Sequence, residues 1–132
     1  MPDRPGSLSL GDQRMPALEH AAHLVARAWR GFDEAREVET VPSADLLALL
    51  AEPLPERPGD VIRDLDLAAD VLDASLAQSR PRYLAYIGSS GLEVGALADL
   101  LAHSYDINLA LDARGATQLE RQTIEWLSAF LG

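Results

Sequence analysis

The short loop at residues 88–91, with the sequence Gly-Ser-Ser-Gly, contains groups that can bind an anion. Its backbone N–H groups and the hydroxyls of Ser89 and Ser90 can hold a carboxylate or a phosphate at the start of a helix. The same residue types are typical of an ordinary turn with a helix-capping serine, and composition alone favours that interpretation. The loop becomes informative only together with its neighbours.

Glu19, His20 and His23 share one face of a predicted helix. Two histidines three residues apart can ligate a metal ion when a third ligand comes from elsewhere. The sequence has no cysteine, and the remaining histidine, His103, lies far away along the chain. We therefore interpret these side chains as surface or packing residues and predict no metal site.

Asp66, Asp70 and Asp73 form a stripe on another predicted helix, where we expect them opposite the apolar face. They lack the glycine-kinked loop of calcium sites, so the pattern favours a solvated face. The Asp-Ala-Ser-Leu run that begins at Asp73 resembles the Asp-Ser-Leu of phosphopantetheine carriers. Because an alanine interrupts that motif and Ser75 is predicted inside the helix, we reject a carrier function.

All 11 basic residues are arginines, so the chain contains no lysine. By itself it therefore cannot perform chemistry that needs a lysine Schiff base. The 21 acidic residues give a net charge of -10, which repels nucleic acids and anionic lipid surfaces. We expect neither nucleic acid nor membrane as a partner.

The composition is typical of soluble proteins, and the absence of cysteine is compatible with a reducing compartment. No cysteine is present, and no disulfide or thiolate chemistry is available. The first thirty residues lack the apolar core of a signal peptide, and no run approaches the roughly 20 apolar residues of a membrane span. We expect a cytoplasmic protein.

Helical periodicity dominates the sequence and predicts a mainly α fold. Residues 1–10 are rich in Pro, Gly and Ser and are predicted to be a disordered leader. A short extended segment is expected near residues 82–87, because a proline precedes tyrosine and isoleucine there. The predicted helices cover residues 12–31, 44–51, 60–77, 91–103 and 117–131.

Capping residues and apolar stripes support these helices. Ser43 and Asp60 are predicted N-caps, and Ser90 with Glu93 has the spacing of a capping box. The region from Asp33 to Asp73 carries 12 acidic residues against three arginines, so its exposed faces must be solvated. The predicted stripes are Met15, Leu18, Ala22, Val25, Trp29 and Phe32; then Val61, Leu65, Ala68 or Ala69, Leu72 and Leu76; then Leu119, Ile124, Leu127, Phe130 and Leu131, with Trp126 beside them.

Several short motifs follow one another in a fixed order between Arg80 and Gly132. Together they resemble the amino-terminal part of group II pyridoxal-phosphate-dependent decarboxylases, of the aromatic-L-amino-acid and glutamate decarboxylase type. Arg80 stands where that family usually has histidine, and Gln118 replaces a glutamate. The matching pieces are Arg-Pro-Arg-Tyr-Leu-Ala-Tyr-Ile at 80–87, Leu-Ala-Asp-Leu-Leu at 97–101, Asn-Leu-Ala at 108–110, Ala-Thr-Gln-Leu-Glu-Arg at 116–121 and Trp-Leu at 126–127.

The resemblance implies a helical amino-terminal segment of a fold-type-I homodimer, in which residues 11–78 contact the partner subunit. Residues 79–132 would carry the substrate-pocket strand and loop and the helices that lead to a cofactor domain. The complete enzyme would use pyridoxal 5'-phosphate, and the groups that hold this cofactor would lie outside this chain. The substrate pocket implied by the resemblance comprises Tyr86, Ile87, Gly88 and Ser89, together with Asn108 and Ala110 from the neighbouring subunit.

Two functions follow as hypotheses. In the first, the chain is part of an amino-acid decarboxylase, a carboxy-lyase, and is a fragment, a split subunit or a degenerate product. Such a chain is inactive alone, binds no cofactor covalently, and needs the remainder of the enzyme or a companion chain. In the second, it is a free-standing acidic helical module that binds a protein partner and has no catalytic activity.

Overall fold

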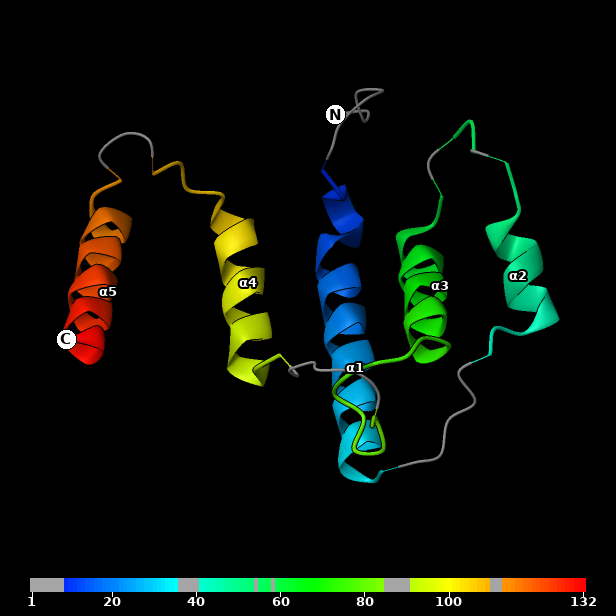
Figure 1. The fold of residues 1–132 in the computed structure, drawn as a ribbon. Coiled ribbons are helices and arrows are strands. Elements are labelled where there is room, and N and C mark those ends of the chain that lie inside the picture. Colours follow the sequence, from blue (N-terminus) through cyan, green and yellow to red (C-terminus); the bar gives the residue numbers. More distant parts are fainter. Residues whose placement is uncertain (1–8, 36–40, 54, 58, 85–90, 110–112) are drawn as a thin grey trace. The chain divides into compact units, whose positions relative to one another are not determined.

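The computed structural model describes residues 9–35, 41–53, 55–57, 59–84, 91–109 and 113–132. These residues are mainly helical, which confirms the predicted fold class, and they contain no strand (Figure 1). A 3-10 helix, η1 at Gly11–Gln13, leads into α1 at Arg14–Asp33, α2 at Ala44–Leu50, α3 at Val61–Asp73, α4 at Glu93–Tyr105 and α5 at Gly115–Leu131. The chain divides into two compact units, Met1–Ser90 and Gly91–Gly132.

Helices α1 and α3 pack side by side and run in the same direction (Figure 1). His20 Nε2 lies 2.7 Å from Asp66 Oδ1, and Arg27 Nη2 donates to Asp73 Oδ2 at 3.3 Å. Both pairs join residues 46 positions apart. Because seven residues make about two helical turns, a single parallel register satisfies both contacts.

The surface of α1 that faces α3 is built mainly from alanines. Ala21, Leu24 and Ala28 of α1 lie across a cavity of about 220 Å³ from an apolar side of α3 formed by Leu65, Ala68, Ala69 and Leu72. Ala17, which is buried, continues this row at helical spacing. Small side chains leave room for close packing of two helices. Leu65, Ala68, Ala69 and Leu72 of the predicted stripe of α3 line one cavity, although Leu72 remains 68% exposed.

The larger apolar residues of α1 lie mostly beside this packing face. Met15 and Leu18 are exposed, and Val25 borders the cavity while remaining 43% exposed. The predicted stripe is thus not the side that packs against α3, because alanines occupy that side. It leaves an apolar surface on α1 that α3 does not cover.

Local capping explains where α2 and α3 begin. Ser43 Oγ accepts from the Leu46 N–H at 3.1 Å, and Asp60 Oδ1 accepts from the N–H groups of Ile62 and Arg63 at 2.9 and 3.0 Å. Each cap satisfies backbone donors that the first helical turn leaves free. Both predicted N-caps are confirmed.

The sequence places the end of the third helix at Ala77, and that prediction is wrong: α3 ends at Asp73. Arg80 Nη2 donates to the Asp73 carbonyl at 2.8 Å, and the guanidinium lies 5.9 Å from the centre of the Phe32 ring on α1. Arg80 thus satisfies a carbonyl at the helix end and connects it to α1. Ser75 consequently lies beyond the helix, although its hydroxyl donates back to the Val71 carbonyl at 2.6 Å.

Replacing Arg80 by alanine is expected to fray the last turn of α3. The substitution removes a charge-assisted hydrogen bond and a cation–π contact from a side chain that is only 15% exposed. Amide hydrogen exchange at Ala74, whose N–H donates to the Asp70 carbonyl, should accelerate by about ten-fold. Arg63→Ala, on the exposed side of α3, is the matched control and should leave that rate unchanged; equal acceleration by both variants would contradict the assigned role of Arg80.

The second unit contains α4 and α5. The start of the fourth helix differs from the prediction, because α4 begins at Glu93 with Leu92 at the N-cap position and no side-chain cap hydrogen bond among the described residues. Ser90, the predicted N-cap of the capping box, lies outside the described residues. The helix ends at Tyr105, where Asp106 adopts a left-handed conformation with φ of 45° that breaks the helical hydrogen-bond pattern. Helix α5 begins two residues before the predicted start, and the Thr117 hydroxyl accepts from the Ala113 N–H at 3.0 Å.

The predicted extended segment is only partly described. Pro81 and Arg82 lie in a turn, and the Tyr83 N–H donates to the Arg80 carbonyl at 2.9 Å, whereas residues 85–87 lie outside the described residues. The extended segment therefore stays a prediction. So does the disordered leader, of which only Ser9 and Leu10 are described. None of the helices in the described part is long and apolar enough to cross a membrane.

Candidate functional site

Most of the substrate-pocket residues implied by the resemblance cannot be located. Tyr86, Ile87, Gly88, Ser89 and Ala110 lie outside the described residues. Asn108 is described, exposed, and follows α4 in the second unit. The proposed pocket therefore stays a prediction.

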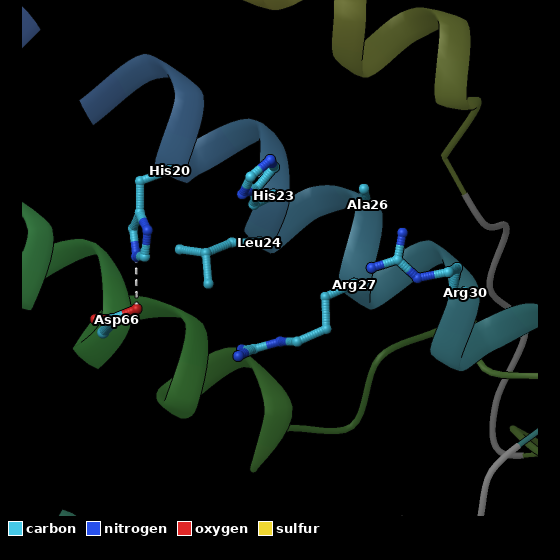
Figure 2. A pocket seen from close by; sticks show the side chains of 7 residues that line it. All are labelled: His20, His23, Leu24, Ala26, Arg27, Arg30 and Asp66. Carbon is cyan, nitrogen blue, oxygen red and sulfur yellow. Dashed lines mark hydrogen bonds and ion pairs between the residues drawn. The ribbon is translucent and has the colours of Figure 1, made fainter. Parts of the chain in front are cut away.

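The described residues form a different polar site, a cavity of about 470 Å³ between α1 and α3 (Figure 2). In Figure 2, His20 and Arg27 extend from α1 toward α3, and His20 meets Asp66. The site is open to solvent, and its polar groups come almost entirely from α1. The lining residues are His20, His23, Leu24, Ala26, Arg27, Arg30 and Asp66.

Helical periodicity brings the four nitrogen-bearing side chains together. Positions 20, 23, 27 and 30 advance in steps of three and four residues, so His20, His23, Arg27 and Arg30 lie along one face of α1. The sequence analysis found the two histidines but missed the two arginines. The same spacing rule, applied to basic residues, would have found them.

Asp66 and Asp73 of α3 do not lie opposite its apolar side as the sequence analysis predicts, whereas Asp70 is exposed as expected. Asp66 contacts His20, and Asp73 contacts both Arg27 and Arg80. With about 100° between successive helical residues, these carboxylates flank the apolar side of α3 and do not oppose it. All are half-exposed, so each pair stabilises the packing by at most about 1 kcal/mol and mainly fixes the register.

The chemistry of this cavity favours an anion over a cation. No group of three His, Asp or Glu side chains in the described part of the chain is arranged to hold a metal ion. Glu19 is exposed and does not line the cavity, so the Glu19, His20 and His23 set is not gathered around one point. Arg27 and Arg30 carry fixed positive charges that oppose cation binding.

The residues of this chain do not fit covalent binding of pyridoxal phosphate. That cofactor is held by a lysine amine, and the sequence contains no lysine. No step of cofactor chemistry is therefore assigned to any side chain described above.

Comparison with known proteins gives one informative similarity. The chain is 32% identical over 97 residues to an aromatic-L-amino-acid decarboxylase of Bacillus atrophaeus, a match that covers 71% of this chain and 20% of that protein. This chain thus spans about a fifth of the length of the relative. No family model matches the sequence, and no solved structure matches. The similarity agrees with a relationship to decarboxylases and leaves the role of individual residues open.

Proposed function

We propose that this chain is the amino-terminal helical segment of a pyridoxal-phosphate-dependent amino-acid decarboxylase. The similarity to the Bacillus atrophaeus decarboxylase over 97 residues carries the proposal. In this function the chain supplies dimer contacts and one wall of the substrate pocket. Because it has no lysine, the cofactor-binding amine comes from other polypeptide.

The exposed apolar surface of the helices supports a role in contacts with other polypeptide. Among the described residues, only Ala17 and Leu46 are buried apolar side chains. Large side chains of α5, such as Leu127 at 55% and Phe130 at 85% exposure, are left open to solvent. Apolar faces of this extent are typical of segments that pack against a partner surface.

The proposed substrate pocket combines the loop after Tyr86 with the neighbouring subunit. Tyr86 would supply an aromatic wall with a hydroxyl, and Ser89 a donor for the substrate carboxylate. Asn108 and Ala110 would approach from the partner chain. Since the relative is named for aromatic L-amino acids, these are the first substrates to test.

The exposed apolar side of α1 provides the test of the proposed dimer contacts. Leu18→Asp places a carboxylate in the second turn of α1, on a side chain that is 44% exposed and does not line the α1–α3 cavities. Self-association measured by sedimentation should weaken by about 30-fold, since leaving a charge unpaired in an apolar contact costs about 2 kcal/mol or more.

Gln13→Asp is the matched control, because it adds the same charge five residues earlier and removes no large apolar side chain. Its self-association should stay close to that of the unaltered chain, and both variants should keep the helical content of the parent. Equal association of the Leu18 variant and the parent would exclude this side of α1 from the dimer contact.

A further inference from the structure

The basic face of α1 stands out in an acidic chain. The protein carries a net charge of -10, yet the cavity of about 470 Å³ is lined by two arginines and two histidines against a single carboxylate, that of Asp66. At about 1.5 Å of rise per residue, His23, Arg27 and Arg30 span about 10 Å along the helix. Their charged or polar ends can therefore converge on one small ligand.

Most of the donors in this cavity remain available for a ligand. His20 is engaged with Asp66, and Arg27 uses one Nη2 contact with Asp73, which leaves most of its five N–H donors. The side chains of His23 and Arg30 make no hydrogen bond or ion pair to any residue that the structure describes. The only carboxylate in the lining is thus already engaged, and the uncommitted groups are nitrogen donors.

We propose that this face is a binding site for a small phosphate monoester or inorganic phosphate, recognised by Arg27, Arg30 and His23. Planar guanidinium groups form paired hydrogen bonds with phosphate oxygens, which a single point charge cannot match. The volume exceeds that of a phosphate group, so a small organic moiety can lie against Leu24 and Ala26. This site does not depend on decarboxylase activity, and it takes its ligand without lysine.

The contacts with α3 make the site more rigid than a helix surface alone. The contact of His20 with Asp66 and the hydrogen bond of Arg27 to Asp73 hold α1 and α3 in register. Arg27, which lines the cavity, is thereby restrained at one end of its guanidinium. A restrained donor loses less conformational freedom when a ligand binds.

The test is a titration of the purified chain with inorganic phosphate against chloride at equal ionic strength, followed through the arginine and histidine side-chain resonances. Saturable shifts at Arg27, Arg30 and His23 are expected. In Arg27→Gln/Arg30→Gln the dissociation constant should rise by about 30-fold or more, the effect of losing several charge-assisted hydrogen bonds. Arg30→Gln alone leaves the Arg27–Asp73 contact intact. This variant should raise the dissociation constant by about ten-fold.

Arg57→Gln/Arg63→Gln is the matched control, because it removes the same charge from two exposed positions of the same unit that do not line the cavity. Its dissociation constant should stay within about two-fold of the parent value. Equal weakening in both double variants would mean that only net charge matters, and would overturn the proposal. Absence of saturable binding, or shifts confined to other residues, would overturn it too.

Discussion

The isolated chain is expected to unfold over a broad temperature range, without the sharp heat-absorption peak of a compact domain. Sharp unfolding requires a core that is lost all at once. Among the described residues, Ala17 and Leu46 alone are buried apolar side chains, and the apolar residues of α4 and α5 are largely exposed. Little apolar surface is therefore removed from water by the described residues within each unit.

Scanning calorimetry measures this directly. A compact domain absorbs about 0.7 kcal/mol per residue at its transition near 60 °C, and this chain should absorb a small fraction of that value. It should also bind a dye that recognises exposed apolar surface. A single sharp transition of a monomer, with the enthalpy of a compact domain, would favour the free-standing interaction module over the decarboxylase segment.

The parts of the fold that could be predicted are those that depend on local chemistry. The caps at Ser43 and Asp60 were predictable because each side chain satisfies backbone N–H groups two or three residues away. The apolar side of α3 was predictable from periodicity alone. In each case, the contact that determines the local structure lies within a few residues of the sequence feature that predicts it.

The parts that could not be predicted depend on contacts between residues distant in sequence, or on which side of a helix packs against its neighbour. The early end of α3 depends on Arg80, whose guanidinium reaches the Asp73 carbonyl and the Phe32 ring. The packing side of α1 depends on Ala21 and Ala28, because small residues allow close approach but give a weak hydrophobic signal. Arg80 occupies the position where histidine is usual in the decarboxylases that the sequence resembles, and the structure gives that departure a role at the helix end.

The candidate functional site also has parts that the sequence predicts and parts that it does not. Motif order indicated the pocket residues from Tyr86 to Ser89, and these positions lie outside the described residues. Of the four nitrogen-bearing side chains that line the described cavity, the sequence analysis identified only His20 and His23, because histidine is a rare residue type. Arg27 and Arg30 were overlooked because arginines on a helix usually indicate a solvated face.

Decarboxylation is expected to require a second polypeptide that supplies the cofactor-binding lysine. Under the proposed function, the Bacillus atrophaeus relative without the fifth of its length that aligns with this chain is expected to supply that polypeptide. In the proposed function, the present chain would replace that segment and restore dimer contacts and one wall of the pocket, which would position the substrate for reaction. The truncated relative alone should be close to inactive, because its pocket lacks that wall.

The most direct measurement is carbon dioxide release from an aromatic L-amino acid with added pyridoxal phosphate. It is made on the chain alone, on the truncated relative alone, and on their mixture. Release above the level of free cofactor is expected only in the mixture. Release by the chain alone, which has no lysine, would contradict the assignment of the reactive amine to other polypeptide.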